Sequence, residues 1–208
     1  MEIIAIDPLF VVINKPSGLL SVPGRGSDSQ DCVVNRIQAL FPDCIDQPAV
    51  HRLDMDTSGL MVVARTSAAH RHLSIQFAER LVDKHYIALL EGIVSQQTGE
   101  IALPFRLDPD NRPHQIYDPL HGKMGISHWR LMAIEGTRSR VEFTPLTGRT
   151  HQLRLHAAHP LGLGIPIVGD RLYGTGKQPG ELLLHAACLA FQHPVSGQMM
   201  SSHLPPSF

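Results

Sequence analysis

The sequence predicts an α+β protein with a central mixed, mainly antiparallel β-sheet and helices packed on it. Two observations favour this class. Short runs rich in β-branched and aromatic residues recur between Gly, Pro and charged turns, and only three segments have convincing helical periodicity. Many strands with few helices are typical of a sheet whose helices cover it rather than link parallel strands. A single domain spanning residues 1–208 is expected, since domains average roughly 150 residues.

The strands are expected wherever a short apolar run is bounded by turn residues. The first two runs are separated by the turn Asp7-Pro8, and the last is a long buried run near the C-terminus. The expected strands are 2–6, 9–13, 49–53, 60–64, 85–93, 100–104, 126–134, 140–146 and 182–194.

Three helices are expected from capping residues and apolar spacing. Asp28 or Ser29 caps the first helix, which runs to Phe41 before a proline ends it. Ser67 caps the second, and Thr150 opens a short third helix after a Gly turn. The residues expected on the buried faces of the first two helices are Val33, Ile37, Leu40, Ala69, Leu73 and Phe77.

Composition excludes several classes of protein. Hydrophobic residues make up 43% and charged residues 18%, which excludes a disordered chain. No apolar run reaches roughly 18 residues, so no membrane span is expected, and the N-terminus lacks the basic region of a signal peptide. The three cysteines are odd in number and lack CxxC spacing, which favours a reducing, cytoplasmic location.

The charges are unevenly distributed although the net charge is −1. The 18 basic residues comprise 14 Arg and 4 Lys, and Arg is suited to two-pronged recognition of phosphate. The stretch 143–177 contains four basic residues and three histidines against a single acid, Asp170. A local basic surface is therefore expected, which permits RNA or a phosphorylated substrate.

The strongest candidate for chemistry is the polar loop 51–59, HRLDMDTSG, between two apolar runs. Functional side chains tend to lie on such loops, where rigid strands support them. Its carboxylates, Asp54 and Asp56, could form an acid–base pair or could simply stabilise the turn. The residues alone leave both alternatives open.

Two further segments are candidates for binding. In 147–156, TGRTHQLRLH, a helix follows a Gly turn and carries Arg149 and Arg154, but a solvated basic helix is equally consistent. In 84–88, KHYIA, Tyr86 lies on a strand, where a tyrosine is more often a core residue than a stacking partner. The 13 histidines lack metal-site spacing, so no metal site is expected.

Taken together, these segments resemble the RluA-type pseudouridine synthase family. HRLDMDTSGL is similar to the family's catalytic loop, KPSGLLSVPG to its N-terminal motif, and KHYIA to its tyrosine motif. TGRTHQLRLH with GDRLYG resembles its third motif, DNRPHQ its insert, and LLLHAACLAFQHP its C-terminal strand. The matches cover nearly the whole chain.

The resemblance implies an isomerase that converts specific uridines in structured RNA to pseudouridine, with no cofactor and no metal. It implies a pseudouridine synthase fold with a catalytic cleft. Because KPSG begins at Lys15, no separate N-terminal RNA-binding domain is expected. The chain looks most like the small members that act on ribosomal RNA and a transfer-RNA anticodon stem-loop. RNA is the expected partner, with no DNA, and a monomer is expected.

The same resemblance implies roles for individual residues. Asp54 stands at the position of the essential aspartate, and Arg154 at that of the cation that keeps it ionised. Tyr86 stands where a tyrosine stacks on the uracil, which requires that the uridine first be flipped out of its stem or loop. Arg52 is placed to fill or brace the vacated space. Asp56 is taken as a turn-stabilising residue.

Three more cations are expected to contact RNA. Arg149 and Lys15 are assigned RNA-contacting or structural roles with equal weight, and a solvated charge is the simplest alternative for both. Arg112 lies in DNRPHQ, where the chain departs from the family: His114 stands where relatives often have Lys, which could weaken a phosphate contact.

Two other functions are consistent with the sequence. One is a catalytically inactive RNA-binding module of the same fold, which the intact set of Asp54, Tyr86 and Arg154 argues against. The other is a hydrolase that uses the His-rich surface, with or without a metal ion; loss of activity on EDTA treatment would favour it.

Overall fold

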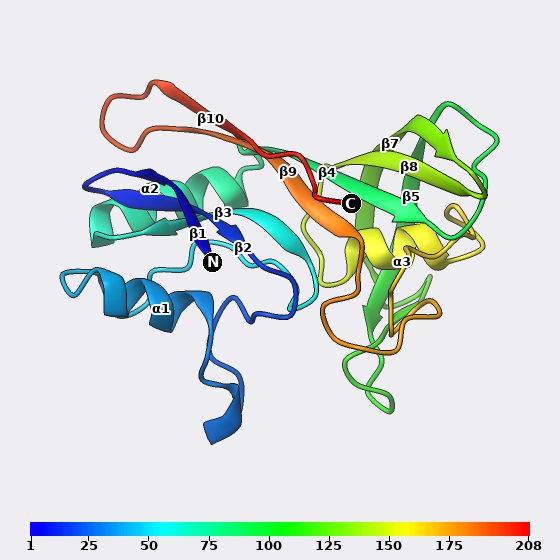
Figure 1. Cartoon of the computed structure of the whole chain (residues 1–208), viewed down its shortest axis with the longest axis horizontal. Coiled ribbons are helices and arrows are strands. Elements are labelled where there is room, and N and C mark those ends of the chain that lie inside the picture. The colour runs from blue at the N-terminus through cyan, green and yellow to red at the C-terminus, as the bar shows by residue number, and fades with distance from the viewer. The chain divides into compact units, whose positions relative to one another are not determined.

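The structure is a computed structural model that describes residues 1–208, except for the side chain of Asp28. The chain divides into two compact units (Figure 1). Unit 1 comprises Met1–Lys84 and His185–Phe208, and unit 2 comprises His85–Leu184. Each unit buries a hydrophobic core of its own.

Unit 1 contains a five-stranded mixed sheet. All its strand pairs are antiparallel except the short parallel pairing of β3 with β9. The strands in spatial order are β1 (Glu2–Ile6), β2 (Phe10–Lys15), β3 (Ser58–Ala64), β9 (Leu184–Gln192) and β10 (Met199–His203).

The middle strands of this sheet, β2 and β3, are buried along nearly their whole length. Their sequences are continuous apolar runs, as expected for strands covered on both faces. The parallel contact with β9 requires Gly59, whose φ is 110° and where a Cβ would lie 2.4 Å from the Ala186 carbonyl oxygen. Gly59 therefore allows the strand that follows the polar loop to join β9.

Two α-helices lie in unit 1. They are α1 (Val33–Leu40) and α2 (Ser67–Ala78), and a short 3₁₀ turn, η1 (Ser27–Ser29), precedes α1. The predicted caps are wrong: Cys32 caps α1 by accepting from the Asn35 amide, and Thr66 caps α2. Of the six residues expected on buried faces, Leu40 is 56% exposed and Phe77 is only partly buried.

Unit 2 is an antiparallel sheet with one helix. The strands in spatial order are β4 (Asp83–Leu90), β8 (Arg138–Pro145), β7 (Lys123–Glu135), β5 (Thr98–Leu107) and β6 (Gln115–Tyr117). Helix α3 (Gln152–Ala158) packs against β7, and its side chains from position 152 to 157 are all buried.

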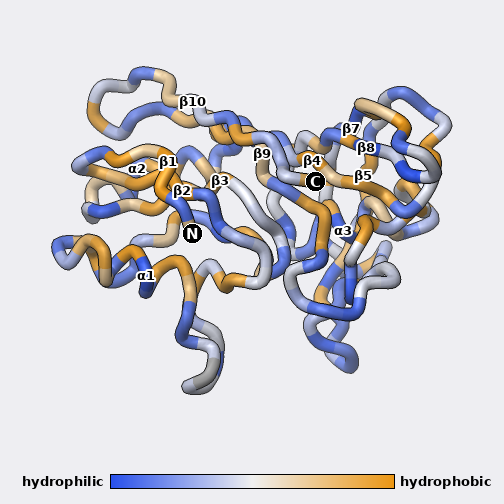
Figure 2. The backbone as a smooth tube through the Cα atoms, in the orientation of Figure 1, coloured by the Kyte–Doolittle hydropathy of each residue, from blue (hydrophilic) through white to orange (hydrophobic). Residues whose placement is uncertain are grey.

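The predicted fold class is confirmed, because the sheets are mixed, mostly antiparallel and accompanied by few helices. In Figure 2 most residues of β9 are coloured hydrophobic, and this apolar run is the pattern from which the strand was predicted. Hydrophobic and hydrophilic residues alternate along α1. No helix among the described residues is long and apolar enough to cross a membrane.

The prediction of a strand at 49–53 is wrong. In this segment only Ala49 forms a β-bridge, with Val63, and the rest is irregular chain. His51 bonds to β3 through its imidazole and not through its backbone. Nε2 of His51 accepts the Val62 amide at 3.1 Å, and the ring stacks on Phe77. Two short strands, β6 and β10, were not predicted, because neither has an apolar run to distinguish it from a turn.

His156 on α3 is a buried histidine in the core of unit 2. It is fully buried against Phe105, and neither ring nitrogen has a hydrogen-bond partner among the described residues. Burial, aided by the charge of His159, lowers the pKa of His156 to about 4. The folded protein therefore holds this imidazole neutral at pH values where the unfolded chain protonates it.

We expect the free energy of unfolding to decrease as the pH falls from about 6.5 towards 4, because only the unfolded state takes up the His156 proton. The His156 contribution is on the order of 3 kcal/mol. In His156→Leu this part of the acid dependence should disappear. Removing two buried nitrogens that lack hydrogen bonds should stabilise the fold and offset the destabilisation caused by the imperfect fit of leucine. Urea denaturation at several pH values measures both effects, and an unchanged pH slope would contradict the assignment.

Candidate functional site

The predicted catalytic loop lies in unit 1, immediately before β3, and the side chain of Lys15 donates a hydrogen bond to its backbone. Lys15 ends β2 and is fully buried. Its ammonium donates to the carbonyl oxygens of Pro16 at 3.0 Å, Leu19 at 2.7 Å and Met55 at 2.8 Å. The three N–H donors of an ammonium match these three acceptors, which tie the KPSG segment to the loop.

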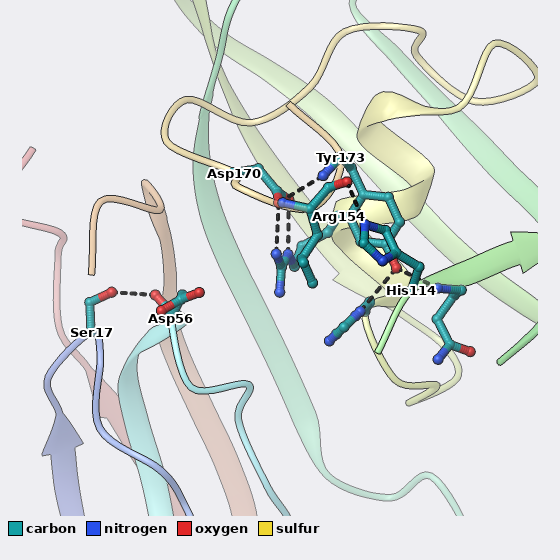
Figure 3. A network of polar contacts seen from close by, with 9 residues as sticks. Ser17, Asp56, His114, Arg154, Asp170 and Tyr173 are labelled. Atoms are coloured by element: carbon teal, nitrogen blue, oxygen red, sulfur yellow. Dashed lines mark hydrogen bonds and ion pairs between the residues drawn. The ribbon is translucent and has the colours of Figure 1, made fainter. Parts of the chain in front are cut away.

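Two serines of the N-terminal motif also hold the loop. Ser17 donates its hydroxyl to the carbonyl of Asp56 (Figure 3). Ser21 donates to the Leu53 carbonyl at 2.7 Å and accepts the Leu53 amide at 3.1 Å. A serine that bonds both polar groups of one residue fixes that residue's peptide planes, so the backbone on both sides of Asp54 is anchored.

The electrostatics of this loop centre on Lys15. Burial lowers the pKa of Lys15 to about 8, and the carboxylates of Asp54 and Asp56 partly oppose that shift. A buried cation therefore lies within electrostatic range of both loop carboxylates. These contacts favour the structural alternative for Lys15 over an RNA contact.

The two loop carboxylates differ in exposure. Asp54 is half-buried, while Asp56 is only 4% exposed. The Asp54 carbonyl accepts the Thr57 amide at 3.1 Å, which closes the turn. Arg52 is exposed. The loop therefore presents Asp54 more than Asp56, in agreement with the turn-stabilising role expected of Asp56.

The junction of β3 and β9 is closed by a histidine whose tautomer can be inferred. Nε2 of His185 faces the Leu204 carbonyl at 3.1 Å, so this nitrogen carries the proton. Nδ1 therefore accepts the Ser58 hydroxyl, at 2.8 Å. Burial lowers the pKa of His185, and the hydrogen bond to Leu204 opposes this only in part. The neutral ring fixes the end of the loop that carries Asp54.

The third motif forms a buried ion pair in unit 2. Arg154, on α3, donates from Nε and Nη2 to the two carboxylate oxygens of Asp170 at 2.8 Å and 2.7 Å (Figure 3). Both side chains are almost completely buried. Burial raises the pKa of Asp170, but Arg154 and the amides of Leu172 and Tyr173 outweigh it, so the pKa lies below its usual value.

This pair bears on the role expected for Arg154. The resemblance assigns its guanidinium to Asp54, whereas the two-pronged contact in unit 2 is with Asp170. The contact with Asp170 uses two of the five N–H donors of the guanidinium. A role for Arg154 towards Asp54 stays a prediction.

A buried glutamine holds the turn that leads into α3. Oε1 of Gln152 accepts the Thr147 hydroxyl at 2.6 Å and the Arg149 amide at 3.0 Å. Its Nε2 donates to the Ile126 carbonyl and to the Ser127 hydroxyl. These four bonds join the TGRT turn to β7, so the start of α3, and with it Arg154, has one position.

The remaining predicted residues of unit 2 fall into two groups. Tyr86 lies on β4 opposite Phe143, half-buried against the core. Arg149 and Arg112 are exposed, as an RNA contact requires. Of the basic residues and histidines in 143–177, Arg154, His151 and His156 are buried, so the expected basic surface depends on Arg149, Arg171 and Lys177, which are exposed.

Sequence reasoning missed Asp170, Gln152, Tyr173 and the role of His114. A signal for Asp170 was present: it is the single acid in a basic stretch, and a buried arginine requires a carboxylate. Nothing in the sequence identifies Gln152 as the centre of a turn, because its four partners come from two segments, and one of these, 126–127, is about 25 residues away. Among the described residues, no group of three or more His, Cys, Asp or Glu could hold a metal ion.

The chain is similar to known proteins along nearly its whole length. The family model described as RNA pseudouridylate synthase matches residues 9–159. The chain is 43% identical to the dual-specificity RNA pseudouridine synthase RluA of Pasteurella multocida, over all of this chain and 94% of the relative. It is 44% identical to the protein of that name from Escherichia coli K12, over 97% of this chain and 91% of the relative.

Solved structures agree with the sequence relatives. Human RNA pseudouridylate synthase domain containing 1 superposes with a TM-score of 0.80 at 29% identity, over all of this chain and 84% of that protein. Human RNA pseudouridylate synthase domain containing 4 shares the fold, with a TM-score of 0.76. With the Asp54 loop anchored to the KPSG motif and Arg154 built into the third motif, the chain belongs to the RluA-type RNA pseudouridine synthases, a family of isomerases.

Proposed function

We propose that this protein isomerises specific uridines in structured RNA to pseudouridine, with Asp54 as the essential carboxylate. The observation that carries the proposal is the anchoring of the Asp54 loop. Lys15, Ser17 and Ser21 bond the backbone of Leu53, Met55 and Asp56, the residues that flank Asp54. A reactive group held by its neighbours' backbone needs little reorganisation to reach its reacting geometry.

The reaction requires a carboxylate and no external reagent. The bond between C1′ and N1 of the uridine breaks, the uracil turns, and C5 joins C1′. C5 then loses its proton and N1 gains one, so the product is an isomer of the substrate. Asp54 adds to the sugar or base, stabilises the intermediate, or removes the C5 proton.

Other residues contribute to binding and to charge. We assign Tyr86 to stacking on the uracil, a contact worth roughly 1–3 kcal/mol per base. We assign Arg154 to stabilising negative charge during the reaction. The uridine must leave its stem or loop to be reached, and Arg52 is placed in the loop that would brace the vacated position.

The substrates we propose are ribosomal RNA, transfer-RNA anticodon stem-loops, or both. The relatives are dual-specificity RNA pseudouridine synthases by name, and identity above 40% along nearly the whole chain supports a shared substrate class. We place the reaction in the cytoplasm and assign it to a single catalytic domain that includes both units.

The test is tritium release from RNA labelled at C5 of uridine, because C5 exchanges hydrogen for carbon in the reaction. Transcripts of ribosomal RNA and of tRNA anticodon stem-loops serve as substrates. Release of tritium, with pseudouridine detected in the digested product, is expected from at least one of them without added metal or cofactor. RNA that is bound but unmodified by the wild-type protein would favour a catalytically inactive binding module.

RNA binding should weaken as salt rises, since exposed arginines release counterions from phosphates. If Arg52, Arg112 and Arg149 each contact a phosphate, the affinity should fall roughly tenfold or more between about 50 and about 200 mM salt. Arg149→Gln should lower the slope of log affinity against log salt by about 1. Arg71→Gln, an exposed arginine on α2, is the matched control. An affinity independent of salt would contradict an RNA substrate.

A further inference from the structure

The insert before β6 and the GDRLYG loop meet at a single histidine in unit 2. Nε2 of His114 lies 3.1 Å from the Leu172 carbonyl oxygen. A carbonyl oxygen only accepts hydrogen bonds, so Nε2 carries a proton and donates to the GDRLYG loop. The Asn111 carbonyl oxygen accepts the His114 amide at 2.9 Å and lies 3.0 Å from Nδ1, so the insert folds back on this histidine.

Tyr173 makes the second connection between the same segments. Its hydroxyl oxygen accepts the Gln115 amide at 2.8 Å, so its own proton is available to Nδ1 of His151, which lies at 2.9 Å. The Tyr173 ring meets the His114 and His151 rings edge to face, both with centroids at 5.7 Å. The tyrosine is thus held between one imidazole from the insert and one from the start of α3.

Both connections lead directly to the Arg154–Asp170 pair. The Leu172 carbonyl receives His114, while the Leu172 amide donates to Asp170 at 2.9 Å. The Tyr173 amide donates to the same carboxylate oxygen at 3.1 Å. His151, which Tyr173 holds, has φ of 56°, a left-handed conformation that a non-glycine residue adopts only when its surroundings hold it there.

We infer that His114 is a positioning residue: it clasps the insert to the GDRLYG loop and so orients Asp170 and Arg154. This inference rests on the proposed function, in which Arg154 serves the reaction. His114 acts through Leu172 and Asp170 and does not touch the RNA. It lies three hydrogen bonds away from Arg154, through Leu172 and Asp170.

The first arm of the test needs no RNA. Amide hydrogen exchange of Leu172, Tyr173 and Gln115 is measured by NMR in the wild type and in His114→Leu. The variant is expected to exchange at Leu172 and Tyr173 roughly tenfold faster or more, because local opening becomes easier. His121→Leu, the same substitution at an exposed histidine of unit 2, should leave these rates unchanged. Unchanged exchange in His114→Leu would overturn the clasp.

The second arm measures the single-turnover rate of pseudouridine formation at saturating RNA, and the RNA affinity. His114→Leu should lower the rate roughly tenfold with little change in RNA affinity, since misplaced groups slow the chemical step. His114→Lys supplies N–H donors on a flexible side chain, so it should restore most of the rate. A wild-type rate in His114→Leu would overturn the positioning role.

The two arms separate this inference from the proposed function. If the wild-type protein formed no pseudouridine in any RNA, the proposed function would fail, while the exchange rates would still decide whether the clasp exists. If exchange accelerated in His114→Leu but the rate of reaction did not change, the clasp would stand as a structural feature and the inference that it positions Arg154 would be rejected.

Discussion

Replacement of Asp54 by Asn is expected to abolish pseudouridine formation and to leave RNA binding in place. The amide has nearly the same shape as the carboxylate, but it carries no charge, is a poor nucleophile and takes up no proton. The loop should keep its conformation, because Lys15, Ser17 and Ser21 bond its backbone and not the Asp54 side chain. Single-turnover rates should fall by roughly a thousandfold or more.

Asp56→Asn is the matched control, since it makes the same change two residues away in the same loop. The Asp56 side chain is buried, so the substitution should act mainly on the stability of the loop. Melting temperature and single-turnover rate are measured for both variants. A rate above a tenth of wild type in Asp54→Asn, or a larger loss of rate in Asp56→Asn, would show that the wrong carboxylate has been chosen.

Arg154→Lys is expected to slow the chemical step by roughly tenfold or more, which corresponds to about 1.4 kcal/mol in the barrier. Lysine keeps the charge but has no planar fork, so it cannot hold both oxygens of Asp170 as Nε and Nη2 do now. The measurement is the single-turnover rate at saturating RNA. A wild-type rate constant with only a changed dissociation constant would leave Arg154 as an RNA contact and nothing more.

Arg154→Met separates stability from catalysis when it is combined with a change at Asp170. Alone, it leaves a buried carboxylate without its cation and should cost about 3–5 kcal/mol of unfolding free energy. Arg154→Met with Asp170→Asn removes both charges but keeps an oxygen for the Leu172 and Tyr173 amides, so it should recover much of that stability. If Arg154 serves the reaction, this stable double variant is still inactive.

The pH dependence of stability should change sign between these proteins. In the wild type the Asp170 pKa is lowered, so the pair stabilises the fold above the ordinary carboxyl pKa and the effect is lost as the pH falls. In Arg154→Met, burial raises that pKa, so stability should instead decrease as the pH rises above about 4. Urea denaturation at a series of pH values follows both trends. The same acid dependence in both proteins would contradict the buried pair.

Local sequence was sufficient to predict most of the fold and to propose a catalytic loop. Continuous apolar runs predicted the buried strands β2, β3 and β9, because a strand covered on both faces has no polar face to interrupt it. The polar loop with Asp54 was identified because its cluster of ionisable residues interrupts two apolar runs. The strand predicted at 49–53 failed because His51 bonds through its side chain and the backbone there does not pair along a strand.

Tertiary structure alone decided which charges are buried and what each one contacts. The sequence did not show that Lys15 lies against three carbonyl oxygens of the KPSG segment and the loop, or that Arg154 forms a two-pronged pair with Asp170. Their partners are up to 40 residues away in the chain, and no local pattern records such a distance. The sequence by itself determined the family and most of the strands, and it singled out Asp54 as the candidate carboxylate. The packing of distant segments determined which side chains hold that carboxylate's loop and the arginine in place, because buried charges must find partners wherever the fold brings them.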